Sequence, residues 1–330
     1  MTRPTLKTIA QETGLAIATV SRALKDASDI GEDTKRRVRE AAARLGYRPN
    51  RAGVRLRTGK TNVIALVLST EADVMNHTSQ LIYSIAAALR GTAYHLVIMP
   101  FFPDQDPMDP VRYIVETQSA DGIVLNQTQP DDPRIRYMAG RGFPFATHGR
   151  TDMGMAHPYF DFDNAAFASL AVRELVRRDR RRLLLVPPPL AQNYARHMIA
   201  GFSDAATEQG AQVEVATDVT SDSPASQIEQ AMRIRFAAPN PPDGVLVGST
   251  TAAMAAVAGA EQAGLAIGRD FDLVAKEAIR ILHRFRPEII VVQEDVSRAG
   301  DFLARALIAA IEGRAPEQGQ FLDTPLAVET

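Results

Sequence analysis

Basic and hydroxyl side chains share one face of a short predicted helix near the start of the chain. The helix reads IATVSRAL, and the spacing of its apolar residues leaves Ile17, Ala18, Ser21, Arg22 and Lys25 facing outward. Guanidinium, ammonium and hydroxyl groups donate hydrogen bonds to the phosphates and base edges of DNA. These residue types therefore indicate contact with DNA rather than catalysis.

Two further predicted helices hold this one in place. The first covers about 8–13 and the third about 32–45, with Gly14 at a turn because a residue without Cβ can take a positive φ. A helix, a tight turn and a second helix form the motif that places a helix in the DNA major groove. The residues predicted to face the core of this head are Ile9, Ala10, Val20, Leu24, Val38, Ala42 and Leu45.

The composition sets the general class of protein. A chain of 330 residues with 45% hydrophobic and 23% charged residues is ordinary for a soluble globular protein of about two domains. No apolar run approaches the ~18 residues that a membrane helix needs, and no signal peptide is evident. The chain has no Cys, which excludes disulfides and thiolate metal sites and favours a reducing cytoplasm.

Charge is distributed unevenly along the chain. Residues 1–60 contain 14 Lys and Arg against 6 Asp and Glu, a net charge of +8, so the rest carries −10. A basic head on an acidic body indicates that nucleic-acid contact is confined to the head. The run RRDRRR at 177–182 is a candidate for a second nucleic-acid site. We favour a structural role, because the run ends an amphipathic helix, where basic residues suit the helix dipole.

From residue 61 onward, apolar strand runs alternate with amphipathic helices. This alternation predicts parallel sheets covered by helices on both faces, in two similar halves with a ligand cleft at the carboxyl ends of the strands. The predicted strands are NVIALVL, AYHLVIM, DGIVL, FPFAT, RRLLLVPP, QVEVAT, GVLVGS and FDLVAKE, and the predicted helices cover about 78–91, 108–118, 131–141, 164–178, 193–209, 225–236, 251–264 and 296–313.

No catalytic or cofactor motif is evident in the body. The sequence contains no glycine-rich phosphate loop, no G-x-S-x-G and no H-E-x-x-H. The six His residues are scattered, and none has a second His at metal-ligand spacing. We therefore expect no enzyme activity, no cofactor and no metal ion. His77 and His148 follow predicted strands and can reach a ligand, although a structural or surface role is favoured for both.

Several stretches resemble the LacI/GalR (lactose/galactose repressor) family of bacterial transcriptional regulators. They are LKTIA near the start, TVSRAL in the second helix, and LGYRPNR followed by LRTGKT. The resemblance is close in the head and general in the body. It implies a fold of an all-α helix-turn-helix domain and hinge helix, followed by an α/β core of two subdomains similar to periplasmic binding proteins. The implied boundaries are 1–48 for the DNA-binding domain, 49–60 for the hinge helix and linker, and 61–330 for the core, whose subdomains are about 61–160 plus 293–320 and about 161–292 plus the C-terminal tail.

The resemblance also assigns DNA contacts by position. Ile17, Ala18 and Arg22 stand where the family reads base edges, and Arg22 can bind a guanine through two hydrogen bonds, worth ~1–3 kcal/mol of discrimination. Ile17 and Ala18 are limited to apolar contacts. Ala16 stands where Ser is common, so a helix cap worth ~1 kcal/mol is lost. The remaining candidate DNA contacts are Thr5, Thr19, Ser21, Tyr47, Asn50, Arg55 and Leu56.

The predicted hinge helix is expected to fold only against a partner. Pro49 ends the preceding helix, and Asn50 can cap a new one. A helix of about eight residues is marginal alone, because nucleation is costly. In the family, two hinge helices pair in the minor groove and a leucine wedges between bases, and Leu56 stands at that position. Gly53 departs from this pattern and weakens the hinge by ~1 kcal/mol relative to Ala, unless the small residue lets two helices approach closely.

In the body, the resemblance implies an effector site at the strand ends. Arg196, in YARHMIAGF, stands where the family places an arginine that binds the effector. Ser249 replaces a common Asn. Glu277 can replace an acidic sugar ligand, and Lys276 either pairs with Glu277, which is favoured, or meets an anionic effector. Further candidates at strand ends and crossovers between subdomains are Asp73, Asn76, His148, Arg150, Asp161 and Gln293.

These observations predict a ligand-responsive regulator that binds double-stranded operator DNA as a cytoplasmic homodimer. The expected role is a repressor of carbohydrate uptake or catabolism genes, released by a sugar or sugar-derived effector. Three alternatives remain: a regulator that needs a purine or acidic metabolite as co-repressor, an enzyme with an appended DNA-binding head, and a regulator with a vestigial cleft. The absence of a recognisable acid–base or nucleophile set argues against the enzyme.

Overall fold

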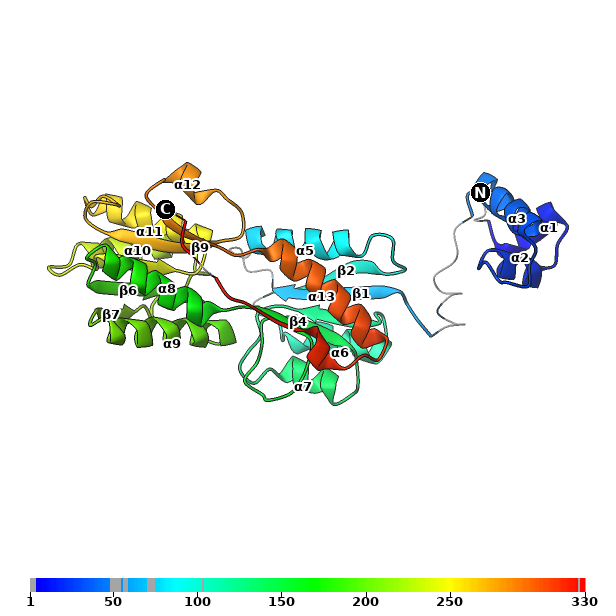
Figure 1. Cartoon of the computed structure of the whole chain (residues 1–330), viewed down its shortest axis with the longest axis horizontal. Helices are drawn as coiled ribbons and strands as arrows, with labels where there is room; N and C mark the ends of the chain where they lie inside the picture. The colour runs from blue at the N-terminus through cyan, green and yellow to red at the C-terminus, as the bar shows by residue number, and fades with distance from the viewer. Residues whose placement is uncertain are drawn as a thin grey trace. The chain divides into compact units, whose positions relative to one another are not determined.

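The computed structural model describes residues 4–47, 55, 59–69, 75–102, 104–325 and 327–329, without the side chains of residues 75 and 76. The chain divides into two compact units, Met1–Thr61 and Asn62–Thr330 (Figure 1). The first unit is the helical head and the second is the α/β body. Among the described residues, no helix is both long enough and apolar enough to cross a membrane.

The head contains the three predicted helices, α1 (Leu6–Thr13), α2 (Ile17–Ala23) and α3 (Glu32–Arg44). Gly14 ends α1 with φ 71°, as the turn requires. The helix α1 begins at Leu6 instead of residue 8, because Thr5 caps it. The Thr5 side chain accepts from the Thr8 amide at 3.3 Å, and the Thr8 hydroxyl accepts from the Thr5 amide at 3.1 Å.

The core of the head matches its predicted pattern. Ile9, Val20 and Val38 are fully buried between the three helices, and Leu24 and Leu45 pack against them partly buried. Ala16, the residue directly before α2, makes no side-chain hydrogen bond that caps the helix, which confirms the predicted loss of a cap.

The body has two parallel sheets with helices on both faces (Figure 1), as predicted. The first sheet has the order β11-β5-β4-β3-β1-β2 and the second the order β10-β9-β8-β6-β7. The strands are β1 (Val63–Ser69), β2 (His95–Phe101), β3 (Gly122–Leu125), β4 (Phe145–His148), β5 (Tyr159–Phe162), β6 (Arg182–Val186), β7 (Gln212–Val215), β8 (Gly244–Val247), β9 (Asp272–Glu277), β10 (Ile290–Gln293) and β11 (Gln320–Asp323).

The helices of the body lie close to their predicted positions. They are α5 (Met75–Ala88), α6 (Met108–Thr117), α7 (Pro133–Ala139), α8 (Asn164–Arg177), α9 (Asn193–Glu208), α10 (Ala225–Phe236), α11 (Thr250–Gln262), α12 (Leu282–Phe285) and α13 (Val296–Ile311), followed by the 3₁₀ turn η2 (Pro316–Gly319). The short elements α12 and η2 are additions to the prediction.

Three strands that the sequence did not predict carry the chain between the sheets. The chain leaves the first sheet after β5 and continues into α8. After β10, a strand of the second sheet, it passes through α13 and returns to the first sheet as β11. The tail then pairs Glu329 with Val291 of the second sheet. The three strands have four residues each, and they lie where the chain crosses between the two halves.

Glycine allows helices to pack closely in the body. Gly300 of α13 faces α5, where an added Cβ would overlap the side chain of Ser84. Gly201 of α9 similarly faces the backbone of Ala165 in α8. A larger residue at either position would push the two helices apart, so close helix packing within each half depends on one of these glycines.

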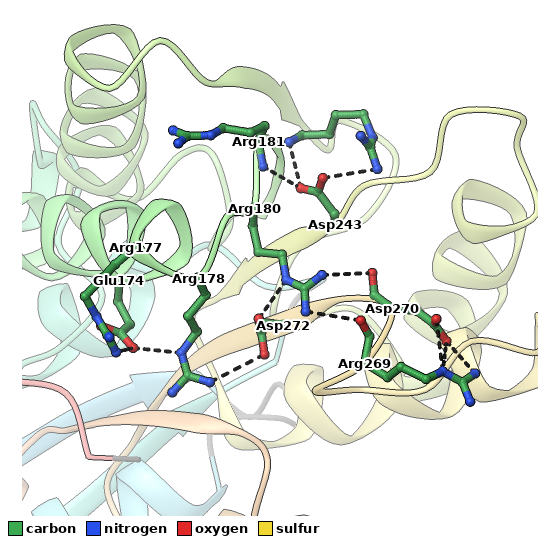
Figure 2. Close-up of polar contacts among 10 residues, drawn as sticks. Glu174, Arg177, Arg178, Arg180, Arg181, Asp243, Arg269, Asp270 and Asp272 are labelled. Carbon is green, nitrogen blue, oxygen red and sulfur yellow. Dashed lines mark hydrogen bonds and ion pairs between the residues drawn. The ribbon is translucent and has the colours of Figure 1, made fainter.

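The basic run at 177–182 forms ion pairs that join α8, β6 and β9 (Figure 2). The buried carboxylate of Asp272, at the start of β9, accepts from Arg180 Nε at 2.7 Å and lies 3.7 Å from Arg178 Nη1. Asp243 accepts from the backbone amides of Arg181 and Arg182, at 2.8 and 2.7 Å. These contacts support the structural role that was favoured for the run.

We expect Asp272→Ala to destabilise the body by about 3 kcal/mol, because it leaves the largely buried guanidinium of Arg180 without its counter-charge. Urea unfolding followed by circular dichroism measures the change. The control is Asp109→Ala, which breaks an exposed pair with Arg112 and should cost less than about 1 kcal/mol. Equal unfolding midpoints for the two variants would contradict a central role for Asp272.

Candidate DNA-contact surface and effector cleft

The helix α2 presents the predicted reading face to solvent. Ile17 is 49% exposed, Ala18 and Arg22 are exposed, and Thr19 and Ser21 are half-buried. The Arg22 guanidinium pairs with Asp29 in the segment before α3. A base contact by Arg22 therefore requires it to exchange this carboxylate for a guanine edge, and the role remains a prediction.

Some of the other predicted DNA contacts lie among the described residues and some do not. The hydroxyl of Thr5 is engaged in the cap of α1, and Tyr47 lies half-buried against the head core. Arg55 is exposed and helical, and its carbonyl accepts from the Gly59 amide at 2.8 Å. Asn50, Gly53 and Leu56 lie outside the described residues.

A cleft with an internal volume of about 110 Å³, partly open to solvent, lies at the carboxyl ends of the strands of both sheets. Its position agrees with the rule that ligands of open α/β sheets bind beyond the strand ends. The residues that line it are His77, Asn126, Gln127, His148, Gly149, Asp161, Phe162, Asn164, Tyr194, Ser221, Asp222, Gly248, Ser249, Lys276 and Glu294.

A buried group of charged and polar side chains forms one wall of the cleft. Glu294, directly after β10, accepts from Lys276 Nζ at 2.7 Å, and His77 Nε2 lies 3.3 Å from its other oxygen. His148 Nε2 lies 3.9 Å from that same oxygen. Lys276 also donates to Asn164 Oδ1 at 3.2 Å. The group therefore connects the second sheet, through Lys276, with the histidines of the first.

The surroundings shift the pKa values of three side chains that line the cleft. Burial opposes the charge on Glu294, but Lys276 and the two histidines hold its pKa well below the usual value. Burial, with the nearby His77, lowers the pKa of His148 to about 3, so this imidazole is neutral at pH 7. Burial raises the pKa of Asp161 to about 7, although Arg150 and Lys276 act in the opposite direction.

Three buried polar atoms at the cleft have no hydrogen-bond partner within the described part of the chain. They are Asn126 Oδ1, His148 Nε2 and Asp161 Oδ2, although Arg150 Nε lies 3.3 Å from the last. Buried polar groups are nearly always hydrogen-bonded in folded proteins. These atoms are therefore free to bind a ligand in the cleft.

Arg196 lies at the rim of the cleft and not among its lining residues. Its guanidinium is 57% exposed and pairs with Asp152 at 2.9 Å. Asn193, one turn earlier on α9, donates from its side chain to the Arg150 carbonyl at 3.0 Å and from its backbone to the Thr128 carbonyl at 2.8 Å. These contacts join α9 of the second sheet to loops of the first, so Arg196 holds the two halves together at this edge.

Other candidates also have partners that the sequence did not indicate. The carboxylate of Glu277 accepts from the amides of Ile281 and Leu282, at 3.1 and 3.0 Å, at the start of α12. The favoured pairing of Lys276 with Glu277 is wrong, because the ammonium is bound to Glu294.

Gln293 and Ser249 also make local contacts. Gln293 donates to the Glu277 carbonyl at 3.0 Å and does not line the cleft. Ser249 lines the cleft while it caps α11 and donates to the Ser221 carbonyl at 3.0 Å. Asp73 and the side chain of Asn76 lie outside the described residues.

Several lining residues were not among the predicted set. Asn126 directly follows β3, which was predicted, so the end of that strand marks it. Glu294 directly follows β10, a strand that the sequence did not predict. Ser221 and Asp222 follow β7 at a longer distance, and no sequence signal marks them. His77, for which a structural role was favoured, lies in the cleft with His148.

Comparison with known proteins places the chain in a family. A family model for "Bacterial regulatory proteins, lacI family" matches residues 5–50, and one for a "Periplasmic binding protein-like domain" matches residues 172–329. The HTH-type transcriptional regulator AglR of Rhizobium meliloti is 31% identical over 95% of this chain and 90% of its own length. The chain belongs to the lacI family.

Another curated relative and two solved structures are also similar to the chain. The HTH-type transcriptional regulator RafR of Escherichia coli is 29% identical over 97% of this chain and 96% of its own length. The lac repressor dimer bound to operator and the anti-inducer ONPF has the same fold, with a TM-score of 0.86 at 21% identity over 99% of this chain and 97% of its own. The CelR–cellobiose complex matches with a TM-score of 0.71 at 22% identity over 99% of both chains.

Membership of the lacI family, together with the head and the cleft, establishes the general function. The protein is a ligand-responsive, DNA-binding transcriptional regulator and not an enzyme. The head supplies the helix-turn-helix, and the body supplies the periplasmic-binding-protein-like fold.

Proposed function

We propose that this protein is a homodimeric repressor of carbohydrate uptake or catabolism genes, released from its operator when a sugar or sugar derivative binds the cleft. The observation that carries this proposal is the cleft itself, which combines unpartnered polar atoms with two aromatic rings. The head at 1–48 would contact the operator, the hinge at 49–60 would fold on it, and the core at 61–330 would bind the effector and the second subunit.

The chemistry of the cleft suits a compact ligand with many hydroxyl groups. Phe162 and Tyr194 can pack against the apolar faces of a sugar ring. Asn126 and Asp161 offer acceptors for its hydroxyl groups. Lys276 is already neutralised by Glu294, which makes it a weaker partner for an anionic ligand. The complex of CelR with cellobiose is a related case of a sugar bound by this fold.

The effector would act by favouring one arrangement of the two halves. The contacts of Asn193 and Arg196 close one rim of the cleft, and a ligand inside it would contact both sheets at once. A ligand shifts such an equilibrium only through its different affinity for the two states. In the proposed mechanism, the bound arrangement separates the two hinge segments, and the heads lose their joint hold on the operator.

A co-repressor of the purine type is the second candidate, because the two aromatic rings of the cleft can also stack on a nucleobase. The two functions differ in sign: an inducer weakens operator binding and a co-repressor strengthens it. The same titration of ligand into a protein–operator complex therefore distinguishes them.

We expect Arg22→Ala to weaken binding to the operator by about 5- to 150-fold and to relax the preference at one base pair in each half-site, since a bidentate guanine contact contributes ~1–3 kcal/mol. The operator would be selected from random DNA with the wild-type protein, and affinity measured by fluorescence anisotropy at fixed salt. Arg305→Ala, on the exposed surface of α13, is the control. The assignment fails if Arg22→Ala binds the selected operator and its single-base variants as the wild type does.

We expect Tyr194→Ala to reduce the affinity for the effector about tenfold or more, because it removes one of the rings that pack against the ligand. Calorimetry with ligands found in a thermal-shift screen of sugars, nucleobases and carboxylic acids measures this change. Tyr113→Ala is the control, as Tyr113 is exposed on α6 and does not line the cleft. If no ligand stabilises the wild type, or if Tyr194→Ala binds its ligand normally, the proposed site is wrong.

The dimer proposal has its support on one long side of the body, where α5 and the edge strand β2 leave apolar residues exposed (Figure 1). Tyr83 is 69% exposed, and Val97 and Ile98 are 40% and 43% exposed. An apolar edge strand of this kind usually has a partner, because it otherwise promotes aggregation. Ile281 and Phe285, at the two ends of α12, are also exposed, and α12 lies on the same side of the body as α5 in Figure 1, so it can extend the interface to the second half.

We expect the double variant Tyr83→Glu, Ile98→Glu to be monomeric where the wild type is a dimer, because two buried charges would face each other across the interface. Sedimentation velocity measures the mass of each. The matched control, Ile234→Glu, changes an equally exposed residue of α10 and should leave the dimer intact. A monomeric wild type, or a dimeric double variant, would exclude this surface.

A further inference from the structure

Two histidines and a glutamate converge on one point at the wall of the cleft. His77 at the start of α5, His148 at the end of β4 and Glu294 after β10 each offer one ligand atom, and these atoms all lie within 4.8 Å of one another. The three residues are far apart in the sequence, which explains why no metal-binding motif is evident there. Two imidazoles and one carboxylate form a common ligand set for zinc with open coordination positions.

The geometry is close to what a metal ion needs. Zinc bonds of about 2.0–2.1 Å in a tetrahedral site separate neighbouring ligand atoms by roughly 3.3 Å. Glu294 Oε1 lies 3.3 Å from His77 Nε2 and 3.9 Å from His148 Nε2. A small rotation of the two rings toward Glu294 would complete the set. His148 Nε2 has no hydrogen-bond partner in the described residues, so it loses nothing by binding an ion.

The second oxygen of Glu294 has a separate partner. Lys276 Nζ binds Oε2 at 2.7 Å and Asn164 Oδ1 at 3.2 Å, and the carboxylate therefore directs Oε1 toward the two imidazoles. Hydrogen bonds of this kind orient metal ligands in many proteins. The ammonium also repels a cation, which lowers the affinity of the site but does not occupy its ligand atoms.

Acidic side chains offer further oxygen ligands in the cleft. Asp161, Asp222 and Glu294 line it together with Lys276. Asp161 is 3% exposed, and its Oδ2 accepts no hydrogen bond from the described residues. Arg150 lies 3.3 Å from Asp161 and Lys276 lies 2.7 Å from Glu294, so the positions of the ligand atoms, rather than an unbalanced charge, are the argument for an ion.

We propose that His77, His148 and Glu294 bind a divalent transition-metal ion of the zinc, cobalt and nickel class at the wall of the cleft. Imidazole nitrogen selects these metals over magnesium and calcium, which prefer oxygen ligands. The ion would replace the hydrogen bond between His77 and Glu294, with the His77 proton moving to Nδ1. Its remaining coordination positions face the cleft, where oxygen atoms of an effector can reach it. This last point rests on the proposed function, whereas the metal site itself does not.

The test uses the full-length, tag-free protein, treated with a chelator and dialysed. Isothermal titration with Zn²⁺ and visible absorption after addition of Co²⁺ measure binding. The wild type should bind one ion per chain. His148→Gln and His77→Gln should each weaken binding about tenfold or more and abolish the absorption bands of a low-symmetry Co²⁺ site. His95→Gln, which changes an exposed histidine of β2, should bind as the wild type does.

A second variant keeps the test decisive if the histidine variants are unstable. Lys276→Gln removes the repelling ammonium and leaves the three ligands, so it should bind Zn²⁺ at least as tightly as the wild type. The proposal is overturned if the wild type binds no ion, if the His77 and His148 variants bind normally, or if Lys276→Gln loses binding as they do. The titration involves neither operator nor effector, so its failure would leave the proposed repressor function untouched.

Discussion

The carboxylate of Glu294 is the interaction on which the cleft depends. It is buried and ionised on the segment that leads from β10 back to the first sheet, and an ionised carboxylate in such a place must be compensated. Lys276 from the second sheet supplies the counter-charge, while His77 and His148 from the first approach its other oxygen. One charged group thus fixes the mutual position of side chains from both halves of the body.

Contacts of α9 add a second connection between the same halves. Asn193, which is fully buried, donates to Asp152 and to the Arg150 carbonyl, and Arg196 pairs with Asp152 at the surface. The exposed pair is weaker than the buried one at Glu294. A ligand that changes the distance between the sheets would break or form the exposed pair at low cost, whereas the contacts of Asn193 hold the two halves more firmly.

The head has a small surface with which to contact DNA bases. The head is a small three-helix unit whose reading face, α2, is largely apolar at Ile17 and Ala18 and has its arginine already paired with Asp29. A face of this kind offers few hydrogen bonds to bases. The proposed dimer compensates by presenting two heads to a symmetric operator, so that modest contacts from each add to a specific complex.

Local patterns in the sequence predict most of the helices and strands and the family. The helices of the head, the cap missing at Ala16 and the parallel alternation of the body follow from local patterns, because helix and strand periods are written in neighbouring residues. The sequence did not determine the short strands β5, β10 and β11, nor the partners of Arg196, Lys276 and Glu277. These strands and contacts become visible only in the folded structure, because most of them join chain segments that are far apart in the sequence. The same reason explains His77, His148 and Glu294, which no spacing connects and which meet only when the crossover segments fold.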